Sequence, residues 1–388
     1  MHSDEMGLGT LLSHLGEEEK VKGAVVSPIF QNSLFLFDTC DDLHKALTTD
    51  LEGPPFHYSR ISNPSVAIAE KKIAALEGAE ACKLCGTGQG AIALAILSVV
   101  AAGAHVIAPD TCYGPVRSML SEMLQRFGVS YTFVDGRDPV DFIDAIRPET
   151  TLIYLESPSS LLFRLQDVDA ITKVARERGI TTIIDNTYNT PIHYNPIKHG
   201  VDIVCHSASK YLGGHSDLTA GALCTTRERM NGIVRHELNY IGSILHPFTA
   251  WLLTRGLRTL PLRLKRHEST GNIVARWLET RPEIDRVHHI SLDSFPQREL
   301  FLKSFSGSGG LFSFEPKVQD PIKIKAFCDS LSLFGRGVSW GGFESLVVPL
   351  PITASGVPDG RWFIRLFCGL EEPGDLVSDL ERAMHLLA

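Results

Sequence analysis

The sequence predicts an α/β protein with a mostly parallel sheet and a smaller C-terminal α/β domain. Three observations lead to this prediction. Short runs rich in Val and Ile are apolar throughout rather than alternating, which indicates strands buried on both faces. Helical patterns separate these runs, as in the crossover connections of a parallel sheet. After about residue 230 the pattern changes to long helical segments, followed by further strands.

The first 62 residues are predicted to be irregular, because "SPIFQNS" and "EGPPF" are loop signals. A helix then begins at Asn63, a residue type that caps helices, with Pro64 in its first turn. Gly78 closes this helix.

The run 91–108 is almost continuously apolar and approaches the length of a membrane span. Gly103 and His105 interrupt it. A buried helix, a turn and a short buried strand therefore fit this run better than a membrane span.

From there strands and helices alternate along the chain. The predicted strands cover residues 105–110, 129–135, 151–158, 181–187, 202–207 and 220–226. The helices between the first of them are "GPVRSMLSEMLQRFG", "PVDFIDAIRP" and "VDAITKVARERG". Beyond residue 230, "PFTAWLLTRGLRTLPLRLKRHESTGNIVARWLE" predicts long helices, and "GGLFSFEP" and "WFIRLFCG" predict strands.

The composition is that of an ordinary globular protein. The 388 residues are 44% hydrophobic and 21% charged, which is enough for two domains and a large core. The net charge of −8 argues against nucleic acid or an anionic membrane as the main partner.

The eight cysteines are scattered along the chain. Cys82 and Cys85 form one C-x-x-C, but no second pair follows, so a packing role is favoured over a metal or redox site. We predict no metal. Buried free thiols suit a reducing cytoplasm. No basic segment followed by an apolar core opens the chain, so no signal peptide is predicted.

Several polar residues follow predicted strands at the point where each strand ends. They are Asp110, Glu156, Asp185 and the group Ser207, Ser209 and Lys210. In open α/β sheets, ligands bind at the carboxyl ends of the strands. Asp185 and Lys210 lie one strand–helix–strand unit apart, so we expect them to meet in one crevice.

A lysine in this setting suggests imine chemistry. A desolvated lysine has a lowered pKa and becomes a nucleophile toward carbonyl groups. Pyridoxal phosphate needs such a lysine, which Lys210 supplies, and a carboxylate at its pyridine nitrogen, which Asp185 supplies. Its phosphate needs amides and hydroxyls, which "GTGQGA" (86–91), Ser207 and Ser209 supply. Tyr113, just beyond a strand end, is placed to stack on the ring.

Each of these features also has a simpler interpretation. A glycine-rich loop occurs in many strand–helix turns. "GTGQGA" resembles part of a dinucleotide fingerprint, but it lacks the third glycine at the right spacing and an acidic residue at the end of the next strand in a suitable context. Asp185 alone is as readily a helix cap, and a single lysine at a strand end is usually solvated. Their combination favours pyridoxal phosphate over a dinucleotide.

The chain resembles the Cys/Met-metabolism pyridoxal-phosphate enzymes, which include cystathionine synthases and lyases and methionine γ-lyase. "HYSRISNPS", "IDNTYNTP" and "HSASKYLGGHSDLTAG" carry this resemblance, which runs from about residue 20 to the end. It implies the cofactor and the aspartate-aminotransferase-like fold, called fold type I, with a seven-stranded sheet. It also implies an N-terminal arm (1–62) that contributes to the neighbouring subunit's site, a cofactor-binding domain (63–250) and a C-terminal domain (251–388).

The resemblance assigns roles to residues of this sequence. Lys210 is the Schiff-base lysine, and Asp185 partners the pyridine nitrogen. Tyr113 stacks on the ring and serves as an acid or base. Tyr58 and Arg60, in "YSR", reach the phosphate of the neighbouring subunit's cofactor, in what is typically a homotetramer of two dimers. The phosphate is held by four residues: Gly88, Gln89, Ser207 and Ser209.

The substrate side of the resemblance is an amino acid. Arg365, in "FIRLFCGLEE", clamps its α-carboxylate, with Ser345 nearby. We predict a lyase that eliminates a group from Cγ, like methionine γ-lyase with altered specificity. Cystathionine β-lyase and γ-replacement on an O-acylhomoserine, as in cystathionine γ-synthase, remain alternatives, as does a non-catalytic relative.

Departures from the family pattern concern the substrate. Ser160 stands where the family usually has Asn, and Ser209 where it has Thr. No cysteine follows Tyr113 in "TCYGPVR", where methionine γ-lyases carry one. "VVPLPITASGVPDG" replaces the usual "HPASMTH" stretch, while "SWGGFESL" resembles bacterial cystathionine β-lyase. An unusual leaving group, such as the oxyguanidine of canavanine, is therefore included among the candidates.

Overall fold

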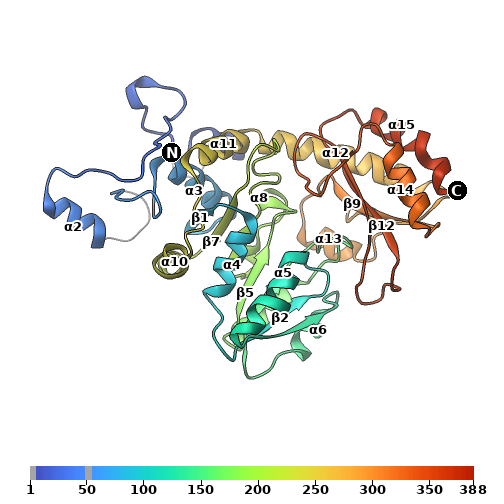
Figure 1. Ribbon diagram of the computed structural model, residues 1–388, viewed down its shortest axis with the longest axis horizontal. Coiled ribbons are helices and arrows are strands. Elements are labelled where there is room, and N and C mark those ends of the chain that lie inside the picture. The colour runs from blue at the N-terminus through green and yellow to red at the C-terminus, as the bar shows by residue number, and fades with distance from the viewer. Residues whose placement is uncertain (1–5, 49–54) are drawn as a thin grey trace.

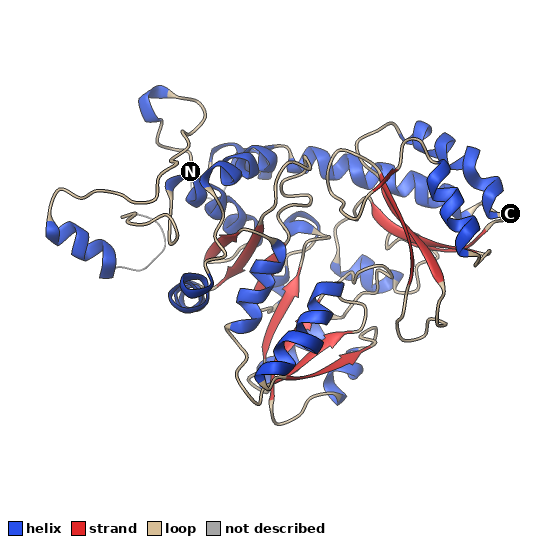
Figure 2. Ribbon diagram, in the orientation of Figure 1, coloured by secondary structure: helices blue, strands red, loops and turns tan. Residues whose placement is uncertain are grey.

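The structure, a computed structural model, describes residues 6–48 and 55–388 (Figure 1). These residues build two separate β-sheets with helices packed against both (Figure 2). The N-terminal arm extends away from the sheets, at the left of Figure 1. The smaller sheet and the C-terminus lie at the opposite end.

The larger sheet has seven strands in the order β1-β7-β6-β5-β4-β2-β3. They are Ala81–Cys85 (β1), His105–Pro109 (β2), Ser130–Val134 (β3), Thr150–Leu155 (β4), Thr181–Asp185 (β5), Ile203–His206 (β6) and Gly221–Thr225 (β7). All neighbouring pairs are parallel except the two that β7 makes, with β1 and β6. The prediction of a mostly parallel seven-stranded sheet is confirmed.

Two hydrophobic clusters cover the faces of this sheet, one drawing on α3 and α7 and the other on α4 and α5. Burial on both faces explains why the strands are apolar throughout. The helices and turns of this part are Pro64–Glu77 (α3), Gly88–Leu97 (α4), Gly114–Ser118 (α5), Pro139–Asp144 (α6), Val168–Glu177 (α7), Thr190–His193 (α8), Pro196–His199 (η5), Arg227–Ile233 (α9), Val234–Leu238 (η6) and Asn239–Ile241 (α10).

α3 forms as predicted. The Asn63 side chain accepts a hydrogen bond from the amide of Ser65, and Gly78 ends the helix with φ of 68°. The predicted helix after Tyr113 continues beyond α5 as a π-helical turn, Met119–Met123 (η3), and a 3₁₀ turn, Leu124–Phe127 (η4).

β1 is the strand of this sheet that the sequence patterns do not predict. Lys83 lies in the middle of it and is nevertheless buried. Its Nζ donates to the carbonyl of Ile61 at 3.0 Å and to the Glu70 carboxylate at 3.3 Å. These two partners compensate the lysine inside the core. Cys82 and Cys85 of this strand form no disulfide and are buried in different clusters, in agreement with the predicted packing role.

The N-terminal arm is more regular than predicted. It contains two helices, Leu8–His14 (α1) and Cys40–Thr48 (α2), and a 3₁₀ turn, Val21–Gly23 (η2). The prediction of irregular structure is wrong there, since α1 packs against α3 and α11 and tertiary contacts stabilise so short a helix. Residues 1–5 and 49–54 of the arm, with part of "EGPPF", lie outside the described residues.

The smaller sheet has five strands in the order β10-β11-β12-β9-β8. They are Ile284–His288 (β8), Leu311–Pro316 (β9), Gly335–Arg336 (β10), Leu346–Pro351 (β11) and Trp362–Phe367 (β12). Arg298–Ser304 (α13), Pro321–Ser330 (α14), Pro373–Ala383 (α15) and Met384–Leu387 (η7) accompany them. β9 and β12 were predicted. β8, β10 and β11 were not predicted. β11 contains two prolines, which are tolerated where β10 no longer pairs with it.

The long helical pattern after residue 246 forms two helices, Pro247–Arg258 (α11) and Leu260–Glu279 (α12). They run from the larger sheet to the smaller one (Figure 1). The predicted domain boundary between residues 250 and 251 lies within α11 and stays a prediction.

The apolar run 91–108 forms the end of α4, a turn and β2, as predicted. In the described ranges, every helix falls short of the length and apolar character that a bilayer crossing requires.

Candidate active site

The carboxyl ends of four neighbouring parallel strands, β2, β4, β5 and β6, meet at one edge of the larger sheet. Asp110, Glu156, Asp185 and Ser207 stand at or just after these ends. The structure therefore brings together the polar residues that the strand pattern places at this edge.

Lys210 lies in the turn after β6, where its amide donates to the carbonyl of Ser207 at 3.1 Å. Its Nζ donates to the Ser339 hydroxyl at 2.7 Å and lies 5.9 Å from the centroid of the Trp340 ring. Burial, followed by the charge of Arg365, lowers the pKa of Lys210, while Asp185 opposes this shift. A lysine with a lowered pKa is a better base and nucleophile at neutral pH.

Ser339 and Trp340 approach Lys210 because Gly341 follows them. A Cβ at Gly341 would lie 2.7 Å from the amide nitrogen of Tyr211, and its φ of +87° also favours glycine.

Asp185, the last residue of β5, is held by Thr187. Its carboxylate accepts hydrogen bonds from the Thr187 amide, at 2.9 Å, and from the Thr187 hydroxyl. The hydroxyl accepts in turn from the amide of Ser207 at 2.7 Å, which ties β5 to the lysine turn. Burial raises the pKa of Asp185, and the hydrogen bonds from Thr187, followed by the charges of His206 and Lys210, oppose this rise. A buried carboxylate of this kind favours a cationic N–H partner.

The N-terminus of α4 forms a cradle against Ser207. The Thr87 side chain caps this helix by accepting from the amide of Gly90 at 2.9 Å. No described residue accepts from the amides of Gly88 and Gln89, and the buried Gln89 Oε1 has no partner among the described residues. A helix N-terminus with free amides binds phosphate well.

The two predicted serines border this cradle differently. Ser207 touches it directly, since a Cβ on Gly88 would lie 2.6 Å from the Ser207 Cβ. The Ser209 hydroxyl accepts from the amide of Ala220 at 2.9 Å and donates to the carbonyl of the same residue at 3.2 Å. Ser209 thus also holds the lysine turn against the start of β7.

Replacing Gly88 by Ala is expected to weaken cofactor binding about ten-fold or more, because overpacking costs about 1–3 kcal/mol. The added methyl group would displace Ser207 from the cradle. A dissociation constant from cofactor absorbance measures this effect. Gly232→Ala is the control, because a Cβ there meets nothing within 4 Å. Equal affinity of the two variants would contradict the cradle.

Tyr113 has Asp185, Glu156 and Arg365 as its charged neighbours. Its amide donates to Glu156 at 2.7 Å, and the Ser160 hydroxyl donates to the other oxygen of Glu156 at 2.6 Å. Burial raises the pKa of the Tyr113 phenol, Asp185 and Glu156 add to this rise, and Arg365 opposes it. The phenol therefore stays protonated at neutral pH and is suited to donate a proton. Burial, with the charge of Asp185 second, also raises the pKa of Glu156.

Arg365 comes from the smaller sheet, in β12. One of its terminal nitrogens donates to the carbonyls of Val338, at 2.7 Å, and Ser339, at 3.3 Å. Burial lowers its pKa to about 10, so the guanidinium is still charged at pH 7. No described residue bonds its other nitrogens, which leaves them for a carboxylate.

Three predicted site residues lie apart from this group. Ser345 is buried, and its hydroxyl donates to Glu371 at 2.9 Å and accepts from the amide of Gly369 at 2.8 Å. Arg60 donates to Asn239 at 3.2 Å and stacks on the ring of Tyr58. No described contact joins any of the three to Lys210, and their assigned roles stay predictions.

The structure adds three residues to the predicted site: Ser339, Trp340 and Thr187. The first two lie in "SWGGFESL" and Thr187 in "IDNT", so the sequence signal was present in quoted motifs. Only their contacts with Lys210 and Asp185 reveal their positions.

These residues fit pyridoxal phosphate. A lysine of lowered pKa, a buried carboxylate and free helix-terminal amides are the partners that its carbonyl carbon, ring nitrogen and phosphate require. The holding residues would be Lys210, Asp185 and the cradle.

Comparisons with known proteins identify the family. Residues 9–385 match the family described as Cys/Met metabolism PLP-dependent enzyme. An L-methionine gamma-lyase of Treponema denticola is 34% identical over 99% of this chain and 98% of that protein. A putative cystathionine beta-lyase of Rhizobium johnstonii is 35% identical over 97% of this chain and 95% of that protein. The crystal structure of metB from Corynebacterium glutamicum superposes with a TM-score of 0.91 at 28% identity, covering 100% of both chains. The chain belongs to the Cys/Met-metabolism family of pyridoxal-phosphate-dependent enzymes.

Proposed function

We propose that the protein is a lyase that eliminates a group from Cγ of an amino acid. The observation that carries this proposal is the convergence of Lys210, Tyr113 and Arg365 from two sheets on one site. It supplies a base, an acid and an anchor for the α-carboxylate. The L-methionine gamma-lyase named above supports the choice of Cγ.

Each side chain has a defined task in this proposal. When bound, pyridoxal phosphate supplies the electron sink that lets a proton leave Cα. Arg365 pairs with the α-carboxylate and orients Cα toward Lys210. Lys210 takes the Cα proton and moves protons at Cβ, and Tyr113 protonates the leaving atom. Asp185 keeps the ring nitrogen protonated.

We further propose that the substrate differs from methionine. Ser160 is bonded to Glu156, which also binds the amide of Tyr113, and the stretch after "FESL" forms β11 and most of the loop that follows it. Both differ from the family pattern, which supports a change in the group that is eliminated. Canavanine, whose leaving group is an oxyguanidine, is one such substrate.

A product assay on the purified, cofactor-loaded protein tests these choices. Cystathionine, methionine, canavanine and O-acetylhomoserine are offered separately, and the keto or amino acid released is identified. 2-Oxobutyrate or homoserine, without an added thiol, would support chemistry at Cγ. Pyruvate from cystathionine would make the protein a β-lyase, and product formation only with an added thiol nucleophile would make it a γ-replacement enzyme.

We propose a homo-oligomer, a tetramer of two dimers, in which the arm reaches the partner subunit. The arm and the α10 region expose large apolar side chains, among them Val25 (83%), Leu36 (91%) and Tyr240 (77%). Such side chains commonly mark subunit interfaces. The arm also carries Tyr58 and Arg60, away from the site of their own chain.

Replacing Arg60 by Ala is expected to weaken cofactor retention about ten-fold, because an arginine–phosphate hydrogen bond is lost. Dialysis followed by absorbance measures retention. Arg178→Ala, at an exposed position after α7, is the control. Unchanged retention in the Arg60 variant would mean that the proposed contact between chains is wrong.

We assign the protein to the cytoplasm because its eight cysteines form no disulfide, seven of them being buried and one exposed. Cell fractionation tests this assignment.

A further inference from the structure

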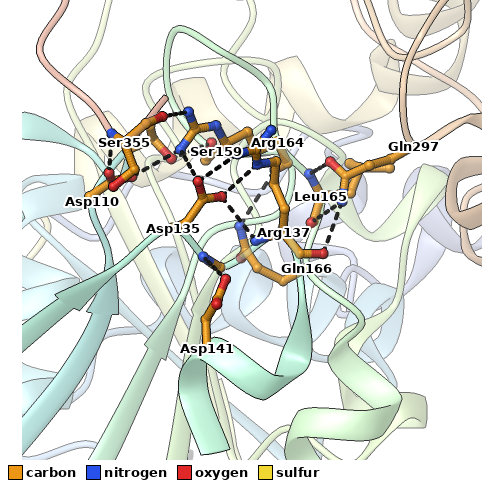
Figure 3. Close-up of polar contacts among 12 residues, drawn as sticks. Asp110, Asp135, Arg137, Asp141, Ser159, Arg164, Leu165, Gln166, Gln297 and Ser355 are labelled. Carbon is orange, nitrogen blue, oxygen red and sulfur yellow. Dashed lines mark hydrogen bonds and ion pairs between the residues drawn. The ribbon is translucent and has the colours of Figure 1, made fainter. Parts of the chain in front are cut away.

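Among the described residues, the hairpin loop 352–361, between β11 and β12, hydrogen-bonds to the part of the chain that carries the larger sheet through Ser355 (Figure 3). The Ser355 amide donates to Asp110 Oδ2 at 2.6 Å. The Ser355 carbonyl accepts from Arg164. Arg164 also donates to Asp110 Oδ1 at 3.2 Å, so the three residues form a closed ring of contacts, which we call the clamp.

The two clamp side chains lie in loops that follow β2 and β4 of the larger sheet, and both are buried. The side chains of Arg164 and Asp110 are only 8% and 11% exposed, so neither can rearrange freely into solvent. Arg164 also lies 3.5 Å from Asp135, which binds Arg137 at 2.6 Å (Figure 3). Both Ser355 contacts use main-chain atoms, so the clamp does not depend on the serine side chain.

Both halves of the clamp belong to loops that carry site residues. Asp110 lies three residues before Tyr113, and Arg164 four residues after Ser160. A hydrogen bond of 2.8 Å between the Thr111 and Ser159 hydroxyls joins the two loops. A movement of the clamp would therefore reach the walls of the site.

The loop after β4 also depends on the hairpin. Leu161 and Phe163 have φ of 68° and 53°, a left-handed conformation that costs about 1–3 kcal/mol for such residues and needs support from its surroundings. Leu162 packs against Ile352 and Phe363 of the hairpin, and Leu161 packs beside them. The Leu161 carbonyl accepts from the Ser313 hydroxyl of β9.

Ser313, the donor in this contact, lies beside Arg365 in the smaller sheet. Ser313 is paired with Arg365 across β9 and β12, and Val348 is paired with it across β11 and β12. Arg365 is thus on the strand that leaves the clamped loop, three residues after Trp362, where β12 begins.

We propose that Asp110 and Arg164 are positioning residues, whose clamp on the main chain of Ser355 sets the position of Arg365 relative to Lys210 and Tyr113. The clamp holds the smaller sheet, which carries Arg365, against the loops that carry Tyr113 and Ser160. The inference rests on the proposed pairing of Arg365 with the substrate α-carboxylate.

The test uses the cofactor-loaded protein and two probes, L-alanine and L-alaninamide, which lack a leaving group and differ at the carboxylate. Dissociation constants are taken from changes in cofactor absorbance. Arg164→Met and the isosteric Asp110→Asn should weaken L-alanine binding about ten-fold or more, because a positioning error costs binding at the displaced group. L-Alaninamide binding should change little, so the preference of the protein for L-alanine over L-alaninamide should decrease. Amide hydrogen exchange in residues 352–361 should accelerate in both variants.

Two further variants complete the test. Ser355→Ala should behave as wild type, because both of its clamp contacts are main-chain contacts. Arg164→Lys should not restore the preference, since one ammonium cannot reproduce the two directions of the guanidinium fork. The inference would be overturned if Arg164→Met and Asp110→Asn kept the wild-type preference for L-alanine over L-alaninamide although amide hydrogen exchange in the loop became faster. It would also be overturned if Ser355→Ala bound L-alanine as weakly as Arg164→Met does.

The variant Arg365→Leu distinguishes a failure of the carboxylate role of Arg365 from a failure of the clamp inference. If it leaves the acid preference intact, the carboxylate role of Arg365 fails. If it abolishes the preference while the clamp variants retain it, only the clamp inference fails.

Discussion

Replacing Lys210 by Ala is expected to lower turnover by about 10⁴-fold or more, because the only proposed base at Cα is removed. Steady-state product formation with the best substrate of the product assay measures this loss. The covalent link to the cofactor should also disappear. Borohydride reduction followed by mass spectrometry checks the link, since the wild-type chain should gain the mass of the reduced cofactor and the variant should not.

Lys173→Ala is the matched control, because Lys173 is an exposed lysine of α7 outside the site. Its turnover should equal that of the wild type. Substantial residual turnover in Lys210→Ala would refute the catalytic assignment of Lys210.

Replacing Arg365 by Leu is expected to lower kcat/KM by about 10²- to 10³-fold, since truncating one partner of a buried charge pair costs about 2–5 kcal/mol. The kcat/KM of Arg365→Lys should lie between those of Arg365→Leu and the wild type, because lysine keeps the charge but not the bidentate geometry. Initial rates over a range of substrate concentrations give the split between kcat and KM.

Arg286→Leu is the control for a lost arginine in the same sheet, because Arg286 is an exposed residue of β8. A kcat/KM in Arg365→Leu equal to that of this control would place the carboxylate elsewhere.

Much of the fold follows from local sequence. The apolar runs of β2 and β4 to β7 and the caps of α3 are visible without any partner, because burial on both faces and capping leave a pattern in consecutive residues. β1, β8, β10 and β11 were not predicted, and two of them, β1 and β11, visibly break that pattern. Lys83 is tolerated in β1 because it binds Glu70 and the carbonyl of Ile61. The prolines of β11 are tolerated because β10 does not pair with that part of the strand.

The same division applies to the candidate site. Lys210, Asp185 and the glycine turn before α4 are recognisable because each sits in a short motif at a strand or helix end. Their roles stay predictions, but the structure brings Lys210, Asp185, Tyr113 and Arg365 within electrostatic reach of one another.

The sequence by itself determined the strand–helix alternation, the family and the cofactor, since these are encoded in neighbouring residues. Tertiary structure alone decided which distant groups complete the site. Ser339 reaches Lys210 across 129 residues of chain, and Ser355 reaches Asp110 across 245. Contacts of this range depend on how the two parts of the chain pack, and those of Ser355 use main-chain atoms that every residue carries, so a local pattern cannot show which residues meet.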